Sequence, residues 1–273
     1  MSAAPSQIAL GDLVFDVAVG GPAGGAPVLL LHGFPHNSAS FAGVLPLLHD
    51  AGLRTITFDQ RGYSPGARPA DVDAYVIDNL MSDALGVLDE LGIDKCLLVG
   101  HDWGGIIGWQ LASRHPDRFT GYVAVSTGHP GAISGALAGG DDQREKSSYI
   151  SFFIEEGAEE KLLARNAVLL RRTCPKEAAL QMQEPGALTG GLNWYRANFT
   201  GDIAAKMPSR RVSIPTTLVW SDGDTALGRE QAEASAGFVD GDYRFVELAG
   251  VDHWVPEKAP EALAAAIIDR AGV

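Results

Sequence analysis

The chain is poor in basic residues and has no long apolar stretch. Its 273 residues include 21 Lys and Arg against 34 Asp and Glu, a net charge of −13. Such an acidic chain is a poor partner for nucleic acid or an anionic membrane surface. No apolar run is long enough to span a bilayer, and residues 1–27 lack the basic and apolar regions of a signal peptide. We therefore expect a cytoplasmic protein, compatible with a homodimer, that binds neither nucleic acid nor membranes and acts on a small molecule.

Cysteine is also scarce. The two cysteines, Cys96 in an expected buried strand and Cys174 in an expected surface segment, offer no disulfide framework. No cluster of side chains has the ligand spacing of a zinc site, so we expect no metal and no organic cofactor.

Strand and helix patterns alternate along most of the chain, which predicts an α/β fold with a mostly parallel sheet. One stretch, residues 130–211, is helical without strands and predicts a cap inserted into a core of residues 1–129 and 212–273. We expect the first part of this cap, residues 131–140, to be a flexible segment that leads into the cap. The expected strands are 13–19, 28–31, 54–58, 96–99, 121–125, 216–220 and 243–248, and the expected core helices are 75–91, 104–114 and 260–270.

The five residues 100–104, Gly-His-Asp-Trp-Gly, have the spacing of a nucleophile elbow with Asp102 at its centre. An apolar strand precedes them and a helical pattern follows, so the side chain of Asp102 would stand at the carboxyl edge of the sheet. A carboxylate placed there can attack an alkyl carbon and form an ester. The alternative is that Asp102 merely caps the following helix.

A second motif, His32-Gly33-Phe34-Pro35, directly follows the expected strand 28–31. Glycine and proline favour a tight turn that aims the backbone N–H of Phe34 at the site. Together with the N–H of Trp103 it would form an oxyanion hole, and both side chains are expected to contact substrate. The alternative is an ordinary turn that ends a strand.

A histidine and three aspartates follow the last two expected strands. His253 would need a carboxylate to orient its ring and stabilise its cation while it takes a proton from water. Asp252 is adjacent and would project another way, which leaves Asp222 and Asp224. The alternative for a lone loop histidine is simple exposure to solvent.

These motifs resemble the α/β-hydrolase fold and, within it, the epoxide hydrolases, over essentially the whole chain after the first dozen residues. The resemblance implies a mostly parallel eight-stranded sheet with helices on both faces and an inserted helical cap. It implies a triad of Asp102, Asp224 and His253, with Asp224 preferred to Asp222 by the family's spacing, and hydrolysis of epoxides to vicinal diols. The motifs are HGFP at 32–35, GHDWGG at 100–105, GVDHW at 250–254 and, in the cap, LNWYR at 192–196.

The cap also carries two tyrosines that matter for the resemblance. Epoxide hydrolases use two cap tyrosines to hydrogen-bond the epoxide oxygen, and by similarity these are Tyr149 and Tyr195. Tyr149, Phe152 and Phe153 recur at helical spacing, so one helix face is aromatic and Phe152 is expected to contact substrate. The alternative is that both tyrosines only pack the cap onto the core.

Two related activities share an aspartate elbow. Haloalkane dehalogenases resemble the chain at Trp103, but they place a second halide donor where this chain has Phe34. Fluoroacetate dehalogenases, which act on a haloacid, carry arginines at the positions of Trp103 and Ile106, so a small carboxylate has no evident anchor here. A ligand-binding protein without activity on the same fold is a further alternative.

Two residues depart from the family pattern. Phe41 stands where many epoxide hydrolases have tryptophan, so it could reshape the pocket, and Ser64 stands where glycine is common. In the same loop as Ser64, Asp59 and Arg61 are expected to be structural.

Overall fold

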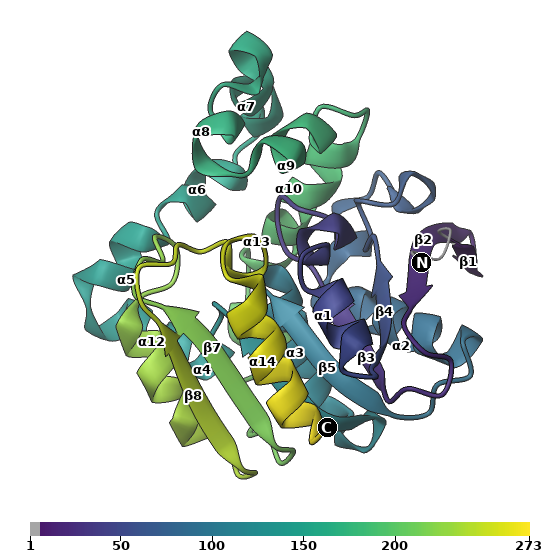
Figure 1. Cartoon of the computed structure of the whole chain (residues 1–273). Coiled ribbons are helices and arrows are strands. Elements are labelled where there is room, and N and C mark those ends of the chain that lie inside the picture. The colour runs from purple at the N-terminus through teal and green to yellow at the C-terminus, as the bar shows by residue number, and fades with distance from the viewer. Residues whose placement is uncertain (1–5) are drawn as a thin grey trace.

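The computed structural model describes residues 6–273, which form an eight-stranded sheet flanked by helices (Figure 1). The strand order is β1-β2-β4-β3-β5-β6-β7-β8. Pairs β1/β2 and β2/β4 are antiparallel and all others are parallel, so the predicted mostly parallel sheet is confirmed. The strands are β1 (Ser6–Leu10), β2 (Leu13–Gly20), β3 (Pro27–Leu31), β4 (Arg54–Phe58), β5 (Cys96–His101), β6 (Phe119–Val125), β7 (Thr216–Ser221) and β8 (Tyr243–Leu248).

The central strands are apolar because helices cover both faces of the sheet. Along β3, Leu29 and Leu31 pack into one core cluster, whereas Val28 and Leu30 pack into the other, as the alternation of a strand requires. The helices are α1 (Leu45–Asp50), α2 (Ile77–Glu90), α3 (Trp103–Arg114), α4 (Pro130–Gly139), α5 (Asp141–Lys146), α6 (Tyr149–Phe153), α7 (Ala158–Ala167), α8 (Leu170–Thr173), α9 (Lys176–Gln181), α10 (Ala187–Asn198), α11 (Ile203–Lys206), α12 (Arg229–Ala234), α13 (Val255–Lys258) and α14 (Pro260–Ala271).

Helices α4 to α11 lie between β6 and β7 in the chain. Helix α4 lies along α12 beside the sheet, while α6 to α10, which we call the cap helices, lie over the edge of the sheet (Figure 1). The division of the chain into a core and a cap domain at residues 130 and 211 stays a prediction.

Helix α10 is fixed to the core by a close backbone contact. A Cβ atom on Gly190 would lie 2.6 Å from the Cα of Gly62, so neither position tolerates a side chain without movement. Beside this contact, the indole N–H of Trp194 donates to the carbonyl of Arg61 at 2.8 Å. The loop that contains Arg61 therefore determines where α10 and its tyrosine stand.

The structure corrects several expectations. Residues 131–140 are not a flexible entry, because nearly all of them belong to α4, where Gly131 packs against Phe238. Cys174 lies in a surface segment as expected, but its own side chain is half-buried. Phe41 is fully buried among Val44, Leu48 and other residues of the second core cluster, so it does not line the pocket.

Strand β1 is an addition, since the sequence did not single it out. In the loop after β4, Asp59 and Arg61 are structural as expected. The carboxylate of Asp59 accepts from Ser38 and Asn37, and the guanidinium of Arg61 binds Asp83.

Candidate active site

Asp102 stands at the sharp turn between β5 and α3. Its φ is 54° and its ψ −118°, a backbone conformation that costs a non-glycine residue about 1–3 kcal/mol. Residues 100 and 104 are glycines because neither position has room for a side chain. A Cβ atom on Gly100 would overlap the carbonyl of Gly104, and one on Gly104 would overlap the carbonyl of Leu31. The elbow geometry expected from the sequence is therefore present.

Two backbone amides face the carboxylate of Asp102. The N–H of Phe34 donates to its Oδ1 at 2.7 Å, and a Cβ on the preceding Gly33 would overlap the same carboxylate. The N–H of Trp103 is close enough to favour the charged carboxylate as well. This is the arrangement of an oxyanion hole, already occupied by one carboxylate oxygen.

His253 joins Asp102 to Asp224. Its Nε2 lies 3.4 Å from Oδ2 of Asp102, and its Nδ1 lies 2.8 Å from Oδ2 of Asp224. The carboxylate of Asp224 has no exposed surface. Asp222 and Asp252 are turned elsewhere and accept from the backbone N–H groups of Gly250 and Trp254, respectively. Of the three candidate acids, the structure thus brings Asp224 to the histidine.

The ionisation of this chain follows from burial and charge. Burial alone would lower the pKa of His253, but the carboxylates of Asp224 and Asp102 outweigh it and raise that pKa well above the usual 6.5. Burial alone would raise the pKa of Asp102, but the hydrogen bond and charge of His253 and the N–H of Trp103 lower it. The two neighbouring carboxylates therefore favour the protonated form of His253 in the resting site.

Two residues that the sequence did not single out support the loop of His253. The ring of His101 donates from Nε2 to the carbonyl of His253 at 2.9 Å, and the hydroxyl of Ser126 donates to the same carbonyl at 3.1 Å. Burial lowers the pKa of His101, so its ring stays neutral. These two hydrogen bonds hold the backbone of His253. Its side chain is held instead by the carboxylates of Asp102 and Asp224.

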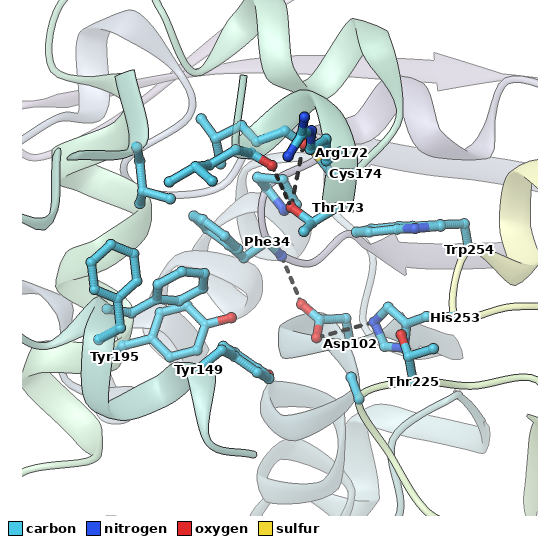
Figure 2. Close-up of a pocket in the computed structure, with 17 residues that line it drawn as sticks. Phe34, Asp102, Tyr149, Arg172, Thr173, Cys174, Tyr195, Thr225, His253 and Trp254 are labelled. Atoms are coloured by element: carbon cyan, nitrogen blue, oxygen red, sulfur yellow. Dashed lines mark hydrogen bonds and ion pairs between the residues drawn. The ribbon is translucent and has the colours of Figure 1, made fainter. Parts of the chain in front are cut away.

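A cavity of about 420 Å³ opens above Asp102. Figure 2 shows Tyr149 and Tyr195 on one side of it, His253 and Trp254 on the other, and Asp102 between them. Its lining residues, mostly apolar, are Phe34, Pro35, Asp102, Tyr149, Phe152, Phe153, Leu162, Leu169, Leu170, Arg172, Thr173, Cys174, Tyr195, Thr225, Ala226, His253 and Trp254.

The two tyrosines are held together, with ring centroids 6.1 Å apart. Burial and the negative charge of Asp102 raise the pKa of Tyr149, and burial and Tyr149 raise that of Tyr195 well above its usual value. Both hydroxyls therefore stay protonated and can donate hydrogen bonds into the cavity.

Among the expected contact residues, Phe34 and Phe152 line the cavity but Trp103 does not. The indole of Trp103 is 1% exposed and packs edge-on against the rings of Trp194, Tyr195 and Phe199. It supports Tyr195 from behind, so its side chain is not part of the wall that a substrate would touch. The sequence also missed the outer wall, where α8 and the residue after it contribute Arg172, Thr173 and Cys174.

Two absences concern residues 6–273. In that range no three His, Cys, Asp or Glu side chains are grouped so that they could hold a metal ion. None of the helices in that range is both long and apolar enough to cross a bilayer.

Comparison with known proteins places these features in a family. Residues 26–155 match the family model of the alpha/beta hydrolase fold. The chain is 33% identical to the AB hydrolase superfamily protein YfhM of Bacillus subtilis over 91% of both chains, and 30% identical to Epoxide hydrolase A of Mycobacterium tuberculosis over 90% of both. Among solved structures, one of novel epoxide hydrolases from hot-environment metagenomes superposes with a TM-score of 0.88 at 29% identity over 99% of both chains. Epoxide Hydrolase A of Mycobacterium thermoresistibile superposes with a TM-score of 0.79 at 27% identity over 98% of both. The predicted α/β-hydrolase fold is confirmed.

Proposed function

We propose that this chain, which belongs to the α/β-hydrolase family and there to the group that contains the epoxide hydrolases, opens epoxides to vicinal diols through an ester on Asp102. The observation that carries the proposal is the composition of one cavity. An ionised carboxylate on a strained turn faces two tyrosine hydroxyls, with an oriented histidine beside it. The fold alone would not support this activity, because one fold hosts many functions.

In the first step, Oδ2 of Asp102 attacks a carbon of the epoxide ring, because Oδ1 is already held by the N–H of Phe34. The carbon–oxygen bond of the ring breaks and its electron pair goes to the epoxide oxygen. Tyr149 and Tyr195 donate hydrogen bonds to that oxygen and supply its proton. The product of this step is a 2-hydroxyalkyl ester of Asp102.

Formation of the ester changes the state of His253. Esterification removes the negative charge of Asp102, one of the two carboxylates that raise the pKa of His253. The imidazolium then gives up its proton more readily, and that proton restores the hydroxyl of the tyrosine that protonated the alkoxide. The neutral ring, still held by Asp224 at 2.8 Å, becomes a base at the moment when the second step needs one.

In the second step, His253 takes a proton from a water molecule that attacks the carboxyl carbon of Asp102. Negative charge develops on Oδ1, where the N–H groups of Phe34 and Trp103 stabilise it; loss of one such donor costs about 3 kcal/mol. The bond between that carbon and Oδ2 then breaks. The leaving alkoxide takes the remaining proton of the attacking water, so the diol leaves with Oδ2 of Asp102 and the oxygen of that water replaces it in the carboxylate.

The cavity indicates what kind of epoxide fits. Its volume of about 420 Å³ and its wall of Phe34, Phe152, Phe153 and leucines suit an epoxide with an apolar or aromatic substituent. The dehalogenase alternatives have less support. Phe34 offers no side-chain donor for a halide, and the indole of Trp103 packs against Tyr195 behind the cavity wall.

The experiment is to incubate a His253→Gln variant with styrene oxide and measure the intact mass. We expect a covalent adduct on Asp102 that accumulates, because alkylation proceeds without the base and hydrolysis does not. A His115→Gln variant, altered at the far end of α3, should form diol as the wild type does. Asp102→Asn should form neither adduct nor diol.

Absence of the adduct, together with absence of diol from the wild type across a small epoxide panel, would overturn the proposal. Halide release from bromoalkanes or fluoroacetate, measured in parallel, would instead support a dehalogenase. Tight ligand binding without turnover, unchanged by Asp102→Asn, would support a ligand-binding protein. A homodimer and a cytoplasmic location stay predictions, which size-exclusion chromatography and cell fractionation would test.

A further inference from the structure

The loop that carries the acid of the triad is organised around its own carboxylate. Oδ1 of Asp224 accepts from the N–H groups of Ala226 and Leu227, at 2.8 and 2.9 Å, while Oδ2 faces His253. The direction of the carboxylate is thus set by the path of residues 224–228. Contacts that hold the backbone of residues 224–228 in place therefore also set the geometry between Asp224 and His253.

Helix α5, which precedes the cap helices, is hydrogen-bonded to this loop through the buried side-chain amide of Gln143. Gln143 is 2% exposed. Its Nε2 donates to the carbonyl of Ala226 at 2.9 Å, and its Oε1 accepts from the N–H of Gly228 at 2.8 Å. Both polar atoms of one side chain therefore bind the backbone of the loop, 83 and 85 residues away in sequence.

The same helix holds the acid itself. Nζ of Lys146 donates to the backbone carbonyl of Asp224 at 2.8 Å. The side chain of Lys146 is only 25% exposed, so the bond is partly shielded from water. The neighbouring Glu145 makes no side-chain hydrogen bond or ion pair with any residue in 6–273. Gln143 and Lys146 together fix the loop at Asp224, Ala226 and Gly228.

We propose that Gln143 and Lys146 are positioning residues, which hold Asp224 in line with His253 and so set the rate of ester hydrolysis. The inference rests on the proposed function and deepens it. Lys146 precedes Tyr149 by three residues, so one short stretch carries both the contact to the triad acid and a hydroxyl donor of the first step. Through it, the helices above the sheet are tied to the water-activating pair.

The two chemical steps depend on this contact differently. Alkylation needs the carboxylate of Asp102 and the tyrosine hydroxyls, none of which binds the loop of Asp224. Hydrolysis needs a correctly oriented His253, because a base contributes only when it lies within hydrogen-bond reach of the proton it takes. Loosening the loop should therefore slow the second step and spare the first.

The test uses Gln143→Met and Lys146→Met, which remove the hydrogen bonds but keep an unbranched side chain, equal in length to glutamine and one atom shorter than lysine. Lys146→Arg is the conservative variant and Glu145→Gln is the matched control. Rapid quenching and intact-mass measurement with an epoxide substrate give separate rate constants for ester formation and ester hydrolysis. We expect both methionine variants to hydrolyse the ester about tenfold more slowly and to form it at the wild-type rate. Lys146→Arg should recover most of the rate, and Glu145→Gln should match the wild type.

A second measurement separates positioning from general stabilisation. In an Asp224→Asn background the histidine has already lost its carboxylate, so adding Lys146→Met should slow hydrolysis no further. Equal losses in both steps, additive losses in the Asp224→Asn background, or unchanged hydrolysis in the methionine variants would each overturn the inference. The proposed function fails separately, when the wild type forms neither adduct nor diol.

Discussion

The ion pair between Arg61 and Asp83 allows a quantitative test of how α10 is held. Nε and one terminal nitrogen of Arg61 donate to the two carboxylate oxygens of Asp83, at 2.8 and 2.7 Å, and the other terminal nitrogen donates to the carbonyl of Ala74 at 2.8 Å. The side chains of Arg61 and Asp83 are only 12% and 6% exposed. Replacing Asp83 by leucine would leave a buried guanidinium with two unpaired donors and no counter-charge.

The expected cost of Asp83→Leu is about 3–5 kcal/mol in the free energy of unfolding, because an uncompensated charge stays buried. The pair itself contributes much less. Burial raises the pKa of Asp83 despite the opposing effect of Arg61, as expected where desolvation offsets much of the attraction. The double variant Arg61→Met/Asp83→Leu should therefore lose only about 1 kcal/mol or less relative to the wild type.

Urea unfolding followed by tryptophan fluorescence measures both values. The reasoning is refuted if Asp83→Leu costs less than about 1 kcal/mol, or if the double variant is as unstable as the single one. Epoxide turnover adds a second readout, because the carbonyl of Arg61 binds the indole of Trp194, next to Tyr195. A stable double variant with full activity would show that the position of the backbone at residue 61 matters for turnover and that the charge of the Arg61 side chain does not.

Three further predictions concern the site. The pKa of His253 in the folded protein lies above the usual 6.5, so the protonated ring stabilises the fold fully below about pH 6.5. This stabilisation is lost as the pH rises through the folded pKa. Melting temperatures measured from pH 6 to 9 should show the loss in the wild type and lack it in His253→Gln. Tyr195→Phe or Tyr149→Phe should slow ester formation about 10- to 1,000-fold in rapid-quench assays, and the double variant should form no detectable ester; wild-type rates in both single variants would exclude the two hydroxyls from the first step. Gly104→Ala should lower the melting temperature and abolish turnover, because the added methyl overlaps the carbonyl of Leu31; a stable, active variant would refute this account of the elbow.

Much of the site could be predicted because its motifs are local. The elbow at Asp102 and the turn at Phe34 are each specified by a few adjacent residues, and glycines mark the places where space is missing. His253 could be placed because it follows the last strand. The choice of Asp224 over Asp222 depended on family spacing, since both aspartates follow β7 and sequence alone does not show where either side chain points.

The remaining features depend on contacts between distant segments. Gln143 lies in a helix rich in charged residues and looks solvent-exposed in sequence, yet its partners are 83 and 85 residues away. Trp103 looked like a substrate contact because it adjoins the nucleophile, but its side chain turns toward α10. Strand β1 is a half-exposed edge strand with a weak apolar pattern, so its existence depends on pairing with β2.

The loop after β7 has consequences for anyone who wishes to redesign selectivity. Thr225 and Ala226 line the cavity, yet they belong to the same turn as Asp224. Enlarging the pocket from that side would disturb the carboxylate that orients His253 together with the shape of the cavity. Leu162 lines the cavity from α7, a helix that carries none of the proposed catalytic residues, so libraries aimed at new substrates should start from that position.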